Sequence, residues 1–548
     1  MAKNWRINVV LALILLFGAA IICRLVSVQI LNYELYKALA QGQQNDFKAV
    51  KGQRGQIFFS KGEILATNIE GRYVYASPEE VSNKEETAQR LSEILSLERE
   101  EIYEKLQKDS LFESIKDIIT EEEESALEQA NMAGVHVADA AARNYPHGIM
   151  ASQIVGFVGG EGKGQYGIEG YYNDVLQGKE EFIKRSPDDN IDGSDIYLTI
   201  DYNLQYFAEK TLEQSKEDID IKGGQIIVAD PNTGRILAIA DYPGFDPNSY
   251  YNSEDFDIFQ NSAVQKLFEP GSTLKPVTMA AGLDLGRITP DTTYVDKGTL
   301  KISGYVIENY AGRVFGESTM TNVLEKSINT GAVFAQKQTG NSDFLRYLDK
   351  FSFFKPTGID LQGETYSENR KLKNGYEIDF ATAAFGQGIE ITPIQLVRAF
   401  CAIANGGKLV KPYVADRIIG GGGQVTETSP EISDSIISSA TVSKLTAMMV
   451  SVVENGYAKS AKIPGYYIAG KTGTAQVPWS ALGESRKGYS EETWQSFIGF
   501  FPAFNPKFVV FIKLDNPKTN TAEYSAVPVF KKIANYIINY YSIPPDYE

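Results

Sequence analysis

The sequence predicts an apolar N-terminal anchor, a charge-rich middle region and an α+β or mixed-sheet C-terminal domain of roughly 350 residues, long enough to bury a sizeable core. Three observations support this organisation. An uncharged apolar run lies near the start, strand–turn–strand patterns lie at both ends of the C-terminal domain, and an amphipathic helical pattern closes the chain. Strands at both ends with helical stretches between them favour one mixed domain.

The anchor is predicted from the run Val9–Cys23, which carries no charge. Apolar residues continue after Arg24, whose long side chain can reach the membrane interface, so about 20 residues are available to span a bilayer. Ala19 and Ala20 are followed by bulky residues instead of a cleavage site, which argues against a removable signal peptide. We therefore expect a single-pass protein with a cytoplasmic tail at 1–6, an anchor at 7–30 and the rest of the chain on the external face.

Charge and composition narrow the chemistry. The 548 residues include 53 Lys and Arg against 70 Asp and Glu, a formal net charge of −17. So acidic a chain is a poor candidate for nucleic-acid binding. Its histidines are His136 and His147 and its cysteines Cys23 and Cys401. These residues are too few and too scattered for a His/Cys metal site, a Ser-His-Asp triad or a disulfide framework, so we expect no metal and no cofactor.

The region 31–190 is mixed and charge-rich. Residues 84–130 carry many Glu and Lys at helical spacing, which we interpret as solvated helices in a spacer. The stretch Gly159–Gly164 is not flanked by a phosphate-binding strand and helix, so we interpret it as turns. The C-terminal domain, 191–548, is taken to follow this region.

Two β-hairpins bracket the C-terminal domain. Ile226–Ala229 and Arg235–Ala240 flank one turn, and Phe497–Phe501 and Phe508–Leu514 flank another. Apolar residues between Phe530 and Tyr541 recur at i, i+3, i+4 and i+7, which predicts a final helix.

The first of three short motifs is Ser272-Thr273-Leu274-Lys275, followed by Pro276. Proline is tolerated in a helix only in the first turn, so a helix over 277–283 must begin close to Ser272. Ser272 and Lys275 then share a face at the positive end of that helix, where amide hydrogens can stabilise an oxyanion. A lysine of lowered pKa could activate the hydroxyl. Taken alone, the pattern is more often a serine helix cap beside an exposed lysine.

The second motif is Ser327-Ile328-Asn329. A second hydroxyl could pass a proton between an amine and a leaving group, and the Asn amide can both donate to and accept from a peptide-like substrate. By itself this motif is equally typical of a polar loop at a helix end.

The third motif is Lys471-Thr472-Gly473-Thr474. On an edge strand, Gly473 would let a substrate backbone approach closely. Lys471 and the hydroxyls of Thr472 and Thr474 would bind a terminal carboxylate. The amide hydrogen of Thr474 could complete an oxyanion hole with that of Ser272. The plain alternative is an ordinary exposed strand end.

The stretch Gly465–Thr472 also fits the nucleotide-binding pattern G-x-x-x-x-G-K-[ST]. Its interior residues are bulky strand formers, Val477-Pro478 breaks any helix that should follow, and the expected external location lacks nucleotide. We therefore reject an ATPase.

In this order and spacing, the three motifs resemble those of the penicillin-recognising serine transpeptidases. Further landmarks resemble class B penicillin-binding proteins, and together they cover about residues 45–515 plus the anchor. These landmarks are Arg54–Ile57, Gly62–Ala66, Arg143–Pro146, Gly167–Glu169, Leu198–Asp201, Thr357–Leu361 and Phe385–Gly388. One departure is Phe59-Ser60, where family members often have an acidic–basic pair, so the contacts of that loop are not predicted.

The resemblance implies a fold and a reaction. The fold would be a membrane helix, an elongated pedestal (dimerisation) domain at 31–190, and at 191–548 a serine β-lactamase-like transpeptidase domain with an antiparallel sheet flanked by helices. The enzyme would cross-link peptidoglycan on the outer face of the plasma membrane, and β-lactams would acylate it.

The resemblance also implies residue roles. Ser272 would attack the D-Ala-D-Ala bond of a stem peptide, Lys275 would take its proton, and Ser327 would relay one to the departing D-Ala. A second stem peptide would then take the acyl group, and a D,D-carboxypeptidase side activity is expected. The substrate-binding residues would be Asn329, Lys471, Thr472, Gly473 and Thr474.

Division-type members of the class usually carry Asn at the third position of the second motif and elongation-type members often carry Asp, so Asn329 favours septal synthesis. Implied partners are a membrane glycan polymerase and other division proteins. The alternatives are an elongation-type transpeptidase for cell shape, a β-lactamase or β-lactam sensor, and a non-catalytic scaffold of the division machinery. The membrane-proximal region disfavours the lactamase and the sensor, and the intact motifs disfavour the scaffold.

Overall fold

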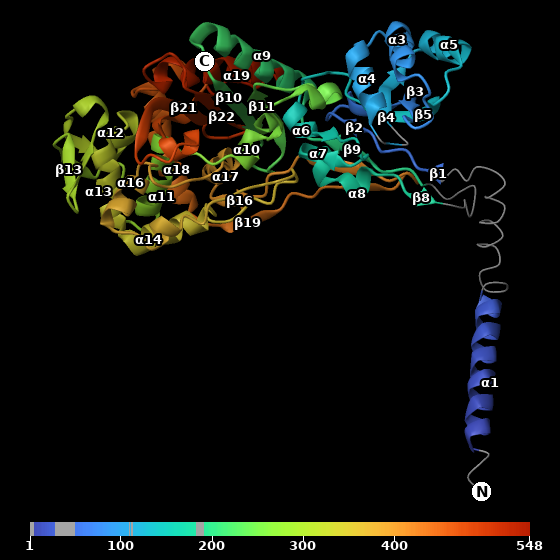
Figure 1. Ribbon diagram of the computed structural model, residues 1–548. Helices are drawn as coiled ribbons and strands as arrows, with labels where there is room; N and C mark the ends of the chain where they lie inside the picture. The colour runs from blue at the N-terminus through green and yellow to red at the C-terminus, as the bar shows by residue number, and fades with distance from the viewer. Residues whose placement is uncertain (1–4, 28–49, 109, 111–112, 182–190, 548) are drawn as a thin grey trace. The chain divides into compact units, whose positions relative to one another are not determined.

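The computed structural model, shown in Figure 1, describes residues 5–27, 50–108, 110, 113–181 and 191–547. Contacts divide the chain into two units. The first comprises Met1–Gln53 with Gly178–Asp192, and the second comprises Arg54–Gln177 with Gly193–Glu548. All three motifs lie in the second unit.

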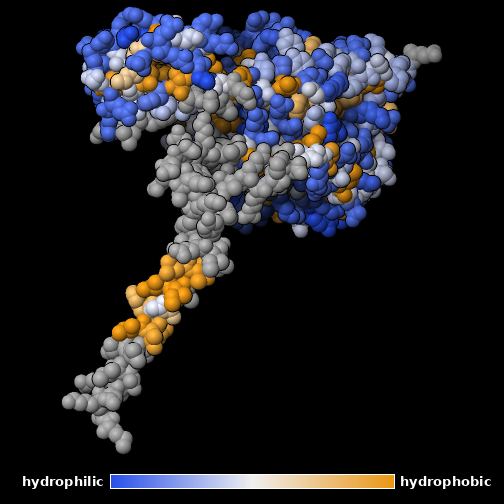
Figure 2. Space-filling view, turned by 90° about the vertical axis from the view of Figure 1, so that its right-hand side faces the viewer, coloured by the Kyte–Doolittle hydropathy of each residue, from blue (hydrophilic) through white to orange (hydrophobic). Residues whose placement is uncertain are grey.

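The first unit contains helix α1, Trp5–Val26, and the short antiparallel strands β1, Val50–Lys51, and β8, Glu180–Glu181. Described apolar side chains of α1 are largely exposed, up to 71% for Phe17, and Figure 2 shows them as a hydrophobic surface. Within the described ranges, no helix has both the length and the apolar character needed to cross a membrane. The predicted anchor ends at 28–30, which lie outside the described residues.

The second unit begins with a mixed sheet in the order β18-β17-β9-β2-β3-β4, with β5 also paired to β3. Strands β2 and β9 are parallel, and the other pairs are antiparallel. This sheet joins strands from both sides of residue 190. Its strands are β2 Ile57–Phe58, β3 Ile64–Ala76, β4 Glu113–Ile119, β5 Val135–Asn144, β9 Asp195–Leu198, β17 Ala415–Ile419 and β18 Val425–Glu427.

Helices are present within 84–130, as predicted, but two of them pack against this sheet, so the prediction that they are solvated spacer helices was wrong. Helices α3, Lys84–Leu95, and α4, Arg99–Gln107, each carry apolar residues four apart. Leu91, Leu95, Ile102 and Leu106 are at most 1% exposed and share a core with Val74 of β3. The charged residues occupy the other faces of these helices, as in any amphipathic helix. Helix α5 is Glu121–Ala130, and β4 interrupts the helical run because its isoleucines pack as a strand beside β3.

The loop at Phe59-Ser60, whose contacts the sequence did not predict, is held mainly by apolar packing. Phe59 is fully buried and packs edge-on against His147 and Tyr202. The Ser60 amide donates to the carbonyl of Ile200. Aromatic packing and this backbone hydrogen bond therefore hold the loop.

A second sheet, in the order β11-β10-β22-β21-β20, forms the centre of the C-terminal region, and all its neighbours are antiparallel. Both predicted hairpins are confirmed as β10–β11 and β21–β22. Strand β10 is wholly buried, and β20 lies at the edge in the described structure. The strands are β10 Gly223–Ala229, β11 Ile236–Tyr242, β20 Ala469–Pro478, β21 Tyr489–Phe501 and β22 Phe508–Asp515.

Helices cover both faces of this sheet, as expected (Figure 1). Helix α9, Tyr202–Ile219, and the predicted C-terminal helix, α19, Ala526–Tyr540, pack together on one face. On the other face lie α10 Ser262–Gln265, α11 Lys275–Asp284, α17 Pro393–Ala404 and α18 Ser439–Glu454.

The remaining elements are short or lie around the motifs. The predicted turn Gly159–Gly164 joins β6, Phe157–Val158, to β7, Gly164–Gln165. The other helices are α6 Ser152–Val155, α7 Gly167–Tyr171, α8 Asn173–Leu176, α12 Met320–Glu325, α13 Asn329–Thr339, α14 Asn341–Lys350, α15 Arg370–Lys373 and α16 Glu377–Ala383. The other strand pairs are β12 Thr293–Asp296 with β15 Gly316–Thr319, β13 Thr299–Ile302 with β14 Tyr305–Glu308, and β16 Lys408–Val410 with β19 Ile432–Ser435.

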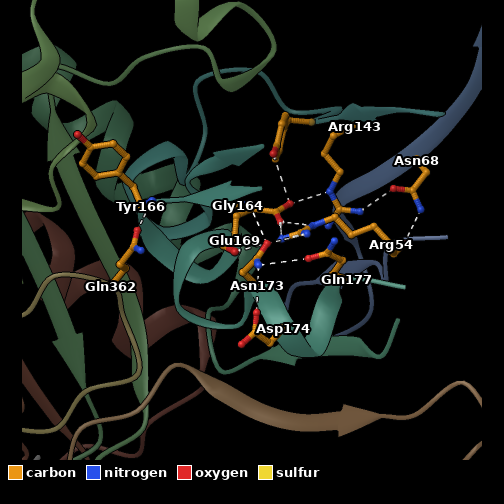
Figure 3. Close-up of polar contacts among 11 residues, drawn as sticks. Arg54, Asn68, Arg143, Gly164, Tyr166, Glu169, Asn173, Asp174, Gln177 and Gln362 are labelled. Atoms are coloured by element: carbon orange, nitrogen blue, oxygen red, sulfur yellow. Dashed lines mark hydrogen bonds and ion pairs between the residues drawn. The ribbon is translucent and has the colours of Figure 1, made fainter. Parts of the chain in front are cut away.

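A buried ion-pair network connects α7 to β3 and β5 (Figure 3). Glu169 of α7 is 0% exposed, with Oε2 2.6 Å from Nη2 of Arg54 and Oε1 2.6 Å from Nε of Arg143. Arg143 also donates through Nη1 to Asn68 on β3. Buried charges are tolerated only when paired and hydrogen-bonded, so these landmark residues hold α7 against the sheet.

Candidate active site

Ser272 lies in a tight turn immediately before α11. Gly271–Leu274 form a 3₁₀ turn, and the α-helix begins at Lys275 with Pro276 in its first turn, which confirms the predicted helix start. The amide of Gly271 donates to the carbonyl of Gly386. A Cβ on Gly386 would lie 2.0 Å from the Gly271 carbonyl oxygen, so only glycine permits this contact. The landmark at 385–388 thus supports the turn that carries Ser272.

Lys275 is fully buried beneath this turn. Its Nζ lies 2.7 Å from the carbonyl oxygen of Ser327, 3.2 Å from Ser327 Oγ and 2.8 Å from Asn329 Oδ1. Burial, and after it the positive charge of Lys471, lower the pKa of Lys275 well below its ordinary value. The lowered pKa favours the neutral amine, which is the form that can accept a proton.

Ser327 occupies the connection between α12 and α13 with a left-handed backbone, φ 54°. A residue other than glycine adopts this conformation at a cost of about 1–2 kcal/mol, so the surrounding contacts must hold it there. The conformation directs both the carbonyl oxygen and Oγ of Ser327 to Lys275. Asn329 is fixed by its side-chain donation to the carbonyl of Glu308, 3.0 Å away.

Lys471 projects from the edge strand β20 to the same hydroxyl. It is 0% exposed, and its Nζ lies 3.0 Å from Ser327 Oγ. Burial lowers the pKa of Lys471 to about 7. Ser327 Oγ therefore lies between two buried amines, and the pKa of each is lowered.

Gly473 is explained by packing within the protein. A Cβ at this position would lie 2.5 Å from Ser496 Oγ and 2.9 Å from Cγ2 of Thr273. The strand thereby packs directly on the turn that carries Ser272. Close approach of β20 to that turn is one observed reason for glycine here, and the approach of a substrate backbone to Gly473 stays a prediction.

The side chains surround a cleft of about 720 Å³. Ser272, Ser327, Asn329, Thr472 and Thr474 line it, while Lys275 and Lys471 are buried beside it. Thr474 Oγ1 accepts from the amide of Ala522, which leaves its hydroxyl hydrogen available to a ligand. Sequence reasoning missed other polar residues of the lining, which lie outside the motifs and landmarks and carry no local pattern. They include Asn309, Tyr310, Arg313 and Tyr457. Lys326, beside the second motif, and Gln387, in the landmark at 385–388, also line the cleft.

Other chemistries are not assembled around this cleft. His136 stacks on Tyr75 and His147 lies against Phe59, and neither is among the lining residues. Across the described ranges, no three His, Cys, Asp or Glu side chains are placed to hold a metal ion. Residues 469–472, which end the apparent nucleotide motif, lie in strand β20 instead of a loop leading into a helix, as our rejection of an ATPase requires.

The chain matches two known family models. Residues 224–535 match the model described as the penicillin-binding protein transpeptidase domain, and residues 49–196 match that of the penicillin-binding protein dimerisation domain.

Curated relatives align over most of their length. Stage V sporulation protein D of Bacillus subtilis is 32% identical over 540 residues, covering 94% of this chain and 83% of the relative. Peptidoglycan D,D-transpeptidase FtsI of Buchnera aphidicola is 28% identical, covering 99% of this chain and 96% of the relative.

A solved structure shares the fold. Penicillin-binding protein 3 from Mycobacterium tuberculosis in complex with aztreonam superposes with a TM-score of 0.73 at 25% identity, covering 91% of this chain and 98% of that chain.

Proposed function

The chain belongs to the penicillin-binding protein transpeptidase family, and we propose that it is a septal-type peptidoglycan D,D-transpeptidase acting through an acyl-enzyme on Ser272. The observation that carries the proposal is the position of Ser327 Oγ, 3.2 Å from the amine of Lys275 and 3.0 Å from that of Lys471. This arrangement can carry protons in either direction without a histidine.

Acylation begins with Lys275 as the base. The neutral amine takes the proton of Ser272 while Oγ attacks the carbonyl carbon of the penultimate D-Ala. Amide hydrogens of Ser272 and Thr474 stabilise the oxyanion. The bond to the terminal D-Ala then breaks, and the proton on Lys275 passes through Ser327 Oγ to the departing amine.

Deacylation reverses the proton path. The amine of a second stem peptide attacks the ester carbonyl and gives its proton through Ser327 to Lys275, which returns it to Ser272 Oγ. Water in place of that amine gives a D,D-carboxypeptidase side reaction. A β-lactam amide in place of the D-Ala-D-Ala bond acylates Ser272 and leaves no departing fragment to make room for an acceptor.

The third motif binds the substrate. Lys471 and the hydroxyls of Thr472 and Thr474 hold the terminal carboxylate through charge-assisted hydrogen bonds. The backbone of β20 around Gly473 pairs with the substrate as an added strand. Asn329 holds the peptide amide.

The cellular role we assign is septal. Asn329 is the residue type expected of division enzymes, and a membrane glycan polymerase and other division proteins would be its partners. Depletion of the protein with imaging of the cells tests this role. Filaments are expected, and round cells would indicate an elongation enzyme instead.

We also propose the domain limits and location. Residues 1–6 form a cytoplasmic tail, 7–30 a membrane anchor, 31–190 the pedestal domain and 191–548 the transpeptidase domain on the outer face. The uncharged run Val9–Cys23 and the exposed apolar side chains of α1 support the anchor. Extraction of membranes at high pH tests it, since an anchored chain stays in the membrane pellet and a peripheral chain is released.

Labelling with a fluorescent penicillin tests the reaction. Wild-type protein should retain the label through denaturation, and Ser272→Ala should not. A label that survives the substitution would reject Ser272 as nucleophile. Release of the label with drug hydrolysis within minutes would identify a β-lactamase.

A further inference from the structure

A second cavity, of about 590 Å³, lies on the other face of the β20–β21 pair, and we refer to it as the rear cavity. Thr493 of β21 lines the catalytic cleft, whereas Glu492 and Trp494 line the rear cavity. On β20, Gln476 lines the catalytic cleft and Val477 lines the rear cavity. Because successive side chains of a strand point to opposite faces, the rear cavity is separate from the cleft. None of the proposed catalytic or substrate-binding residues lines it.

Buried hydrogen-bond acceptors without partners meet in the rear cavity. Neither carboxylate oxygen of Asp241 nor Oε1 of Gln225 accepts a hydrogen bond of ordinary geometry in the described structure. The Asp241 carboxylate oxygens are buried, and Gln225 is 3% exposed. The two residues are directly opposite each other on β11 and β10, so their side chains share one face of the sheet. Unsatisfied buried acceptors are rare and unfavourable, so these oxygens are free to accept hydrogen bonds from a bound donor.

The charges that line the rear cavity favour a cation. Lys222 is paired with Glu492, and Lys513 is paired with Asp515. Within each pair the positive and negative charges neutralise each other. The lining charges outside these pairs are Asp241, Asp255, Asp257 and Lys266, which leaves a net charge of two negative when Asp241 is ionised.

The protein's own groups only partly compensate Asp241. Burial raises the pKa of Asp241 to about 7, and the nearby Ser262 hydroxyl, Lys266 and Lys513 oppose this rise. Neither lysine lies within ion-pair distance of the carboxylate in the described residues. A cation bound at Asp241 would therefore find a carboxylate without a competing ion pair.

Aromatic rings form the adjacent wall. Phe268 and Trp494 both line the rear cavity, and their centroids are 6.1 Å apart in an edge-to-face arrangement. Such rings pack well against an alkyl chain or a delocalised cation.

We propose that the rear cavity binds a small molecule carrying an alkylguanidinium group, with the guanidinium on Asp241 and Gln225 and the alkyl part against Phe268 and Trp494. A guanidinium matches this site because its planar fork can donate two hydrogen bonds to the carboxylate and a further one to the amide oxygen.

Calorimetric titration of the full chain in detergent with n-butylguanidinium tests the proposal, with n-butylurea as its uncharged isostere. Saturable binding of one n-butylguanidinium per chain is expected, at least about tenfold tighter than n-butylurea. Equal affinity for both compounds, or no saturation at about 10 mM n-butylguanidinium, would overturn it.

Two variants locate the site. Asp241→Asn should weaken n-butylguanidinium binding by at least about tenfold. Gln225→Met should weaken it less, and this variant serves if Asp241→Asn does not melt cooperatively. The matched control is Glu254→Gln, which removes the same charge from an exposed position outside the lining and should bind as wild type. Wild-type affinity in both site variants, or equal weakening in the control, would refute the assignment.

Discussion

Replacing Lys471 by methionine should raise the pKa of Lys275 and move the acid limb of penicillin acylation to higher pH. The proposed base must be neutral to accept the Ser272 proton, so the acylation rate constant should fall as pH drops through the pKa of Lys275. Burial is the larger cause of that low pKa, and the charge of Lys471 is the second. Lys471→Met removes only the second cause.

The structure bounds the size of the shift. The two Nζ atoms lie 3.2 and 3.0 Å from the same Ser327 Oγ. Their separation is therefore about 6 Å at most, and at an effective dielectric constant of about 20 two charged amines at this separation repel by at least about 2.7 kcal/mol, or about two pKa units. Because the pKa of Lys471 is itself lowered to about 7, its charge is only partly present near neutrality. We expect an upward shift of about one pH unit.

The assay is the single-turnover acylation rate with a fluorescent penicillin across about pH 5 to 9, at saturating drug so that weaker carboxylate binding does not enter. The control, Lys337→Met, removes the same charge from an exposed position on α13, and its limb should move by less than about 0.3 unit because solvent screens that charge. A limb that stays in place or moves to lower pH in Lys471→Met would refute the electrostatic coupling. An equal movement in Lys337→Met would refute its dependence on position.

Substitutions at Ser327, Gly473 and Glu169 test the site and its support. Ser327→Ala should slow acylation by about a hundredfold or more because the hydroxyl between the amines is lost. Ser327→Gly relieves the left-handed backbone and should be equally slow. Wild-type acylation rates in either variant would exclude the relay. Gly473→Ala should destabilise the fold by about 1–3 kcal/mol in thermal melts, since its Cβ would lie 2.5 Å from Ser496 Oγ. Adding Ser496→Gly to this variant should recover part of the lost stability. An unchanged melting temperature in Gly473→Ala would contradict the packing argument. Glu169→Gln should lower the free energy of unfolding, measured with denaturant, by about 3–5 kcal/mol because two buried arginines lose their counter-ion. An unchanged free energy of unfolding would show that the network is not needed for stability.

Local signals predicted the elements that carry the motifs. Turn residues between β-prone segments gave both hairpins, and 3.6-residue periodicity gave the C-terminal helix. Pro276 placed the start of α11 because its ring is accepted only where amide hydrogens lack helical partners. These features depend on neighbours within a few residues.

Charge misled the prediction for residues 84–130. The number of Glu and Lys indicated solvated helices, whereas the apolar stripes of α3 and α4 pack on a sheet in which only β4 comes from this range and β3 and β5 come from outside it. A stripe that is narrow and interrupted by charges can be recognised only once the surface that it contacts is known.

Local sequence patterns specify which side chains are present for the reaction and which short elements hold them. Long-range packing gives Ser327 its left-handed backbone, places its hydroxyl between Lys275 and Lys471, and buries both amines. Ser327 lies 52 positions after Lys275, and Lys471 lies 144 positions after Ser327. Their pKa values arise from desolvation and from a charge across that separation, and neither exists until the chain has folded.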